Sequence, residues 1–210
     1  MRSKARPSLA GLTFAVLAGM LAAFVLPSLA SPMALSIIVE RRDSSIEIFV
    51  EVPAARLNDV FGVVPSEILN DNGTVAIDRL REGTWDVADA LMQSTNATLG
   101  EKQLRLEGMS MMVHPSNLPV PFRDAIDGIT AIGVCQVLPS DGPLYLDDTI
   151  AYSGFIGYGS QTGRPLRLDF PITGRLPRLV EIRDYADGKL LQRSWSLLED
   201  GGSLTIGGAG

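Results

Sequence analysis

Residues 35–52 read LSIIVERRDSSIEIFVEV, two apolar runs separated by a short polar stretch. In the second run, the even positions from Ile46 to Val52 are β-branched and apolar, and glutamates stand at 47 and 51 between them. An apolar period of two is typical of a strand with one buried face. Residues 35–40 predict a preceding strand, and residues 41–45 fit the loop between the two. The stretch therefore predicts a β-hairpin.

Strand patterns dominate the rest of the chain. Apolar and polar residues alternate over 166–170, and residues 150–158 place isoleucine, tyrosine and glycine on one face. Residues 132–138 are apolar at both parities, which favours a central strand in which Cys135 is a buried and inert side chain.

Helix patterns are few. Pro53 could open one short helix, Thr84 could cap a second with Trp85 on its buried face, and a further turn is expected over residues 122–126. We therefore predict a mainly β fold, an antiparallel β-sandwich with two or three short helices and a helical insertion between residues 53 and 95. An α+β fold is the alternative.

A second hairpin is expected near the C-terminus. Asp187 and Gly188 form the dipeptide that a two-residue turn with positive φ prefers. Counting outward from this turn places Trp195 inward, opposite Val180, and leaves Arg183 on the solvent-exposed face.

The N-terminus has the three parts of a cleavable Sec-type signal peptide over residues 1–30. It begins with three cations and no acid, continues with an apolar run over 9–26, and ends in Ser-Leu-Ala at 28–30. An uncleaved N-terminal membrane anchor is the alternative, because the run is close to the roughly 20 residues that a spanning helix needs. Both predict that residues 31–206 form one β-rich domain that is periplasmic or secreted in a bacterium, tethered to the inner membrane in the second case. Residues 207–210 are expected to be a flexible tail.

Composition excludes several classes of function. The chain has 18 Lys and Arg against 24 Asp and Glu, a net charge of −6, which argues against nucleic acid as a partner. Its single cysteine excludes an internal disulfide and a CxxC redox pair, and its single histidine excludes any site that needs two imidazoles.

Residues 104–114 hold the main concentration of metal-capable side chains. The apolar positions change from even to odd after Gly108, and such a phase change is what a β-bulge produces. Met112 and His114 would then face outward together, and a thioether beside an imidazole suits copper(I). A third ligand is not evident from the sequence. Core packing of the methionines with a surface histidine is the alternative interpretation.

The segment 164–183 is basic within an acidic protein. Five arginines stand against Asp169 and Glu181 there. We expect an outward cluster of guanidinium groups that binds an anionic or carboxylate-bearing partner, formed by Arg167, Arg175, Arg178 and Arg183. Pairing of these arginines with acids on neighbouring strands is the alternative.

A serine hydrolase would have to use His114 as its base, and neither Ser153 nor Ser160 lies in a G-x-S-x-G motif. The sequence therefore favours an exported, non-catalytic binding or accessory protein that engages another envelope or membrane protein. A periplasmic copper(I)-binding protein is the alternative, and a small hydrolase is a third, weaker candidate. No cofactor other than that copper(I) is expected.

Overall fold

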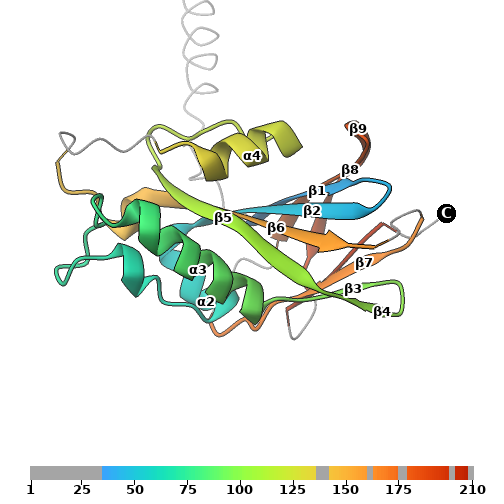
Figure 1. Cartoon of the computed structure of the whole chain (residues 1–210), viewed down its shortest axis with the longest axis horizontal. Coiled ribbons are helices and arrows are strands. Elements are labelled where there is room, and N and C mark those ends of the chain that lie inside the picture. Colours follow the sequence, from blue (N-terminus) through green and yellow to red (C-terminus); the bar gives the residue numbers. More distant parts are fainter. Residues whose placement is uncertain (1–34, 136–141, 160–162, 175–178, 199–201, 208–210) are drawn as a thin grey trace, which may run out of the picture. The chain divides into compact units, whose positions relative to one another are not determined.

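The computed structural model describes residues 35–135, 142–159, 163–174, 179–198 and 202–207 (Figure 1). The predicted signal peptide, its membrane-anchor alternative, and residues 208–210 of the predicted tail lie outside these ranges. Within the described ranges, no helix has the length and apolar character needed to cross a membrane.

Six strands form the larger sheet. Their spatial order is β5 (Leu106–Pro115), β6 (Thr149–Tyr158), β2 (Ser45–Pro53), β1 (Leu35–Arg41), β8 (Leu179–Ala186) and β9 (Lys189–Leu197). Neighbours are antiparallel except for β1 and β8, which are parallel. The predicted N-terminal hairpin is confirmed, with Ile38 opposite Phe49 and Arg41 opposite Ile46.

Four short strands form the second sheet. Their order is β10 (Ser203–Ile206), β7 (Leu166–Asp169), β3 (Asn96–Leu99) and β4 (Lys102–Leu104). Leu166 and Leu168 of this sheet belong to the same buried cluster as Ile46 and Ile48 of the larger one. The two sheets therefore share one hydrophobic core.

Among the described residues, three short α-helices complete the fold: α2 (Leu57–Phe61), α3 (Leu80–Ser94) and α4 (Ala125–Gly133). Single 3-10 turns lie at Ala54–Arg56, Ser66–Ile68 and Leu146–Asp148. Figure 1 shows α4 on the opposite side of the six-stranded sheet from α2 and α3. The prediction of a mainly β fold, mostly antiparallel and with few short helices, is confirmed.

The predicted start of the central helix is wrong. α3 begins at Leu80, so that Thr84 lies within it as a buried residue and is not its N-cap. The buried positions recur from Leu80 through Val87 to Leu91. This phase leaves Trp85 on the other side of the helix, 55% exposed, where burial was expected.

The central strand predicted over residues 132–138 is also wrong where the structure describes it. Ile132 and Gly133 end helix α4, and Cys135 is exposed after it. Asp124 begins this helix as its N-cap, with a side-chain oxygen that accepts a hydrogen bond from the Asp127 amide at 3.0 Å. A short apolar run has the same appearance in a helix and in a buried strand, and this explains the error.

The C-terminal hairpin has the predicted turn but another register. Asp187 and Gly188 have φ of 47° and 74°. Between Asp184 and Tyr185 the pairing shifts, with Leu191 as the extra residue of a bulge on β9. Glu181 is consequently opposite Trp195, which is 52% exposed. The expected burial of Trp195 against Val180 is therefore wrong, because one bulged residue moves every later side chain to the other face.

Candidate functional site

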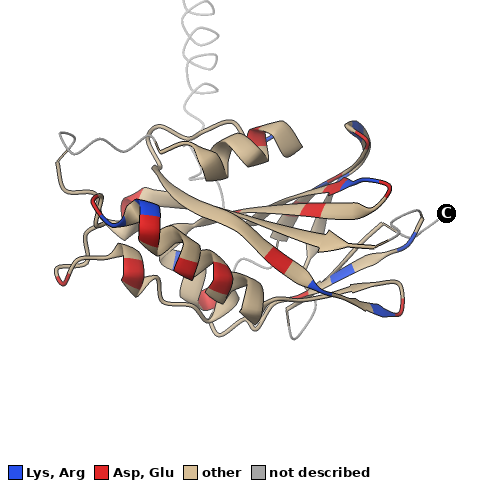
Figure 2. Ribbon diagram, viewed as in Figure 1, with Lys and Arg blue, Asp and Glu red and all other residues tan. Residues whose placement is uncertain are grey.

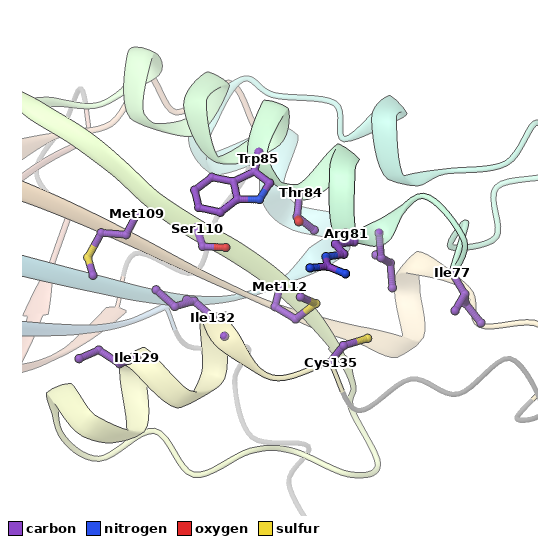
Figure 3. Close-up of a pocket in the computed structure, with 12 residues that line it drawn as sticks. Ile77, Arg81, Thr84, Trp85, Met109, Ser110, Met112, Ile129, Ile132 and Cys135 are labelled. Carbon is purple, nitrogen blue, oxygen red and sulfur yellow. The ribbon is translucent and has the colours of Figure 1, made fainter.

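A groove of about 640 Å³ lies beside β5, between α3 and α4. Trp85 reaches it from α3, Ile129 and Ile132 from α4, and Ser110 and Met112 from β5 (Figure 3). Trp85 is 55% exposed and Ile129 is 45% exposed, so two large apolar side chains stand in solvent on the opposing walls. Water contact at such surfaces is unfavourable, and an apolar ligand between the walls would remove it.

The floor of the groove is an edge of the larger sheet. Among the described strands, β5 pairs with β6 alone. The predicted bulge is confirmed: the pairing shifts between Gly108 and Ser110, which makes Met109 the unpaired residue. An edge strand presents backbone N–H and C=O groups on its outer side, and these can pair with an added extended chain.

Helix α4 approaches the sheet closely because three of the four buried residues on it are small. A Cβ on Gly128 would lie 2.5 Å from Cγ of Phe49 on β2, closer than carbon atoms can pack. Ala125 and Ala131 are buried on the same side of the helix. The packing of α4 against Phe49 therefore fixes the position of one wall of the groove.

His114 contributes a hydrogen bond to this arrangement. Its Nε2 lies 2.7 Å from the carbonyl oxygen of Ala131 in α4. Because a carbonyl can only accept, Nε2 carries the proton and Nδ1 carries the lone pair. Nδ1 is buried and has no hydrogen-bond partner among the described residues. Burial lowers the pKa of His114, while the bond to Ala131 opposes that change.

The prediction that Met112 and His114 face outward together is wrong. Both are on the same face of β5, but α4 covers that face, and their exposed fractions are 8% and 0%. The His114 ring instead packs edge to face with Tyr152, with ring centroids 5.3 Å apart. Met112 lines the groove and His114 does not.

Sulfur-bearing side chains gather in the groove. Met109, Met112 and Cys135 all line it, and Figure 3 shows Met112 and Cys135 toward one end and Met109 toward the other. No group of three or more His, Cys, Asp or Glu residues suited to a metal ion occurs in the described part of the chain. A metal in this groove would accordingly depend on sulfur.

Charge in the groove comes mainly from Arg81. This exposed residue of α3 makes no hydrogen bond or ion pair with other described residues. Helix α4 carries Asp127 as its one charged residue, and Asp127 is bound by Arg123 at 2.8 Å. Figure 2 shows acidic residues spread along α3, but none of them lines the groove. An anionic group on a ligand would therefore find its partner at Arg81.

The predicted arginine surface is dispersed over two sheets where it is described. Arg167 on β7 is held by Asp169 at 2.9 Å. Arg183 on β8 is bound by Glu181 at 2.8 Å, and its side chain is only 15% exposed, so the expected exposure of Arg183 is wrong. Arg175 and Arg178 lie outside the described residues. The structure therefore contains the pairing of the alternative interpretation for the two described arginines, because each of them pairs with a nearby acid.

The histidine and serine considered for a hydrolase do not meet. Ser153 is opposite Val50 and Met111, which face the main core. His114 faces the other side of the sheet, next to Tyr152. Ser160 lies outside the described residues. The described residues therefore form no relay between Ser153 and His114.

From the sequence, neither Arg81 nor Ile129 was identified as a candidate, and Trp85 was assigned to a buried helix face. If the helical period is extended back to Leu80, Trp85 is predicted to lie on the exposed face of that helix. If residues 125–133 are taken as a helix, Ile129 is predicted to be exposed as well. A scan of protein-family models finds no match to the chain, and a search of curated proteins finds none either. The groove is consequently the feature that bears on function.

Proposed function

We propose that the protein is exported by a bacterium to the periplasm or beyond, and acts there as a non-catalytic binding protein for another envelope or membrane protein. The observation that carries the proposal is the groove. It combines exposed apolar walls with a strand edge that has no second strand partner within the described residues.

The groove favours an extended segment of the partner over a helix. A chain added to β5 would point alternate side chains to opposite faces of the sheet. One set would contact Trp85 on α3, and the other set would contact Ile129 on α4. The partner segment is therefore apolar at both its even and its odd positions, so that both of its faces are apolar. An acidic residue of the partner near Arg81 would supply the negatively charged group with which Arg81 forms no ion pair in the described chain.

Selection of peptides from a random displayed library tests this chemistry on the full chain. We expect extended apolar sequences with one Asp or Glu. Ile129→Asp should weaken their binding by about tenfold or more, and Arg81→Glu should change the selected acid to a base. The matched control is Val64→Asp, because Val64 is 62% exposed but does not line the groove. Equal losses in the control and the groove variants would contradict the proposal.

Hydrogen exchange distinguishes strand addition from other binding modes. A peptide paired with β5 should slow exchange at the outward amides of residues 109–113. Binding without protection in that segment would mean that the peptide does not extend the sheet.

Export has its own test. The protein recovered from outside the cytoplasm is expected to begin at Ser31, after cleavage at the Ser-Leu-Ala sequence. A chain that retains residues 1–30 in the membrane fraction would support the anchored alternative. A chain found in the cytoplasm would contradict export.

Copper(I) binding is the second candidate function. Met112 and Cys135 line the same end of the groove, and copper(I) prefers sulfur ligands. A competitive copper(I) titration should show weaker binding in Met112→Leu and in Cys135→Ser. Met111→Leu is expected to have little effect, because Met111 does not line the groove. No difference between the parent chain and the two sulfur variants would exclude this site.

A further inference from the structure

Strand β9 is a second free edge, at the far end of the larger sheet from β5. It has β8 as its one neighbour among the described strands. Four large apolar side chains on it are more than half exposed: Leu190, Leu191, Trp195 and Leu197. Long apolar edges are normally shielded by proline, by charges or by bulges, because they invite pairing with another strand. The bulge of β9 is confined to Leu191, and residues 192–197 pair regularly with β8. β9 has nine residues and no proline.

Its one mid-strand charge is held by a salt bridge. Arg193 binds Glu181 of β8, with Nη2 and Oε1 2.7 Å apart. Glu181 in turn holds Arg183 at 2.8 Å. The Arg193 guanidinium is thus fixed over the sheet beside Trp195, which is directly opposite Glu181 in the β8–β9 pairing. Glu181 thus pairs with both Arg183 and Arg193, and Arg193 is the one charged residue between positions 190 and 197 of this edge.

We propose that β9 pairs with β9 of a second copy, in an antiparallel register whose twofold axis passes through Ser194. In this register, Trp195 lies across from Arg193 of the second copy, and Leu191 lies across from Leu197. An aromatic ring thus meets a guanidinium group, and leucine meets leucine. A twofold axis uses the same edge in both copies and closes the assembly at two.

The neighbouring registers are less favourable. An axis through Arg193 would place the two Arg193 side chains opposite each other, and like charges directly opposite are destabilising. An axis through Trp195 would place Arg193 across from Leu197. Charge and apolar matching therefore select the Ser194 register from the three.

Cysteine cross-linking tests both the pairing and its register. The two copies of a residue on the axis lie directly opposite each other, with their Cα atoms about 4.5–5.5 Å apart, a distance that a disulfide can span. In the full chain purified in mild detergent, Ser194→Cys should give a covalent dimer on oxidation. Gln192→Cys should not, because residue 192 faces residue 196 of the second copy. The parent chain, whose single cysteine is Cys135, gives the background.

Sedimentation over a concentration series provides the second readout. The parent should show dimers, and Leu191→Lys should weaken the association by about tenfold or more. Leu191→Lys combined with Leu197→Glu should restore it, since the two new charges face each other across the axis. A monomer at every concentration overturns the proposal. So does preferential cross-linking through Arg193→Cys or Trp195→Cys, which would assign another register.

Discussion

Arg41 and Arg42 are adjacent in sequence but should differ sharply in their effect on stability. Arg41 is buried between the two sheets. Its Nε donates to Asp184 Oδ1 at 2.8 Å, and its two terminal nitrogens donate to the carbonyls of Arg164 and Ile206 at 2.9 and 3.1 Å. Arg42 binds Glu47 at 3.0 Å, with 46% of its side chain exposed.

Arg41→Ala leaves the Asp184 carboxylate buried, at 4% exposure, without its cation. Removal of one partner from a buried ion pair costs about 3–5 kcal/mol, a large part of the roughly 5–15 kcal/mol by which a domain is stable. Arg42→Ala should cost about 0–1 kcal/mol, because solvent screens an exposed pair. Urea unfolding measures both free energies. Unfolding of Arg41→Ala and Arg42→Ala at the same urea concentration would contradict this prediction.

Three further predictions concern stability and pH. Burial raises the pKa of Glu51 from 4.5 to about 7. Because the unfolded chain loses this proton at a lower pH, the free energy of unfolding should fall as pH rises from about 4.5 to about 7. Glu51→Gln should reduce this pH dependence in a urea–pH series. Gly128→Ala should destabilise the fold by about 1–3 kcal/mol because its Cβ meets Phe49, whereas Gly133→Ala in the same helix, with open space around its Cβ, should be neutral or slightly stabilising on thermal unfolding. Gly188→Val should cost about 1–3 kcal/mol because valine resists the φ of 74° in the β8–β9 turn, and an unchanged midpoint of thermal unfolding would exclude that strain.

Local patterns correctly predicted the N-terminal hairpin, the β5 bulge and the C-terminal turn. The alternation from Ile46 to Val52 needed only the period of two, and the phase change after Gly108 located the bulge at Met109. The turn at Asp187 and Gly188 followed from the preference of these residues for positive φ. Each of these features depends on residues close together in the chain.

Features that depend on distant segments were missed. The face of β5 that bears His114 was taken as exposed, because nothing near it in sequence reveals that α4 lies over it. The second bulge, at Leu191, has no glycine to mark it in the sequence. The expected register of Trp195 is wrong because this bulge was not predicted. The groove arises from the positions of α3 and α4 on either side of β5, so its residues could not be grouped from the sequence alone.

Photocross-linking in the exporting cells tests whether another envelope protein occupies the groove between α3 and α4. Trp85 replaced by p-benzoylphenylalanine places the probe on the groove wall, and the same probe at Val64 is the control away from the groove. We predict one adduct of defined mass from position 85 that is lost when Ile129→Asp is added, and no such adduct from position 64. Absence of an adduct at 85, or equal labelling from both positions, would contradict the account.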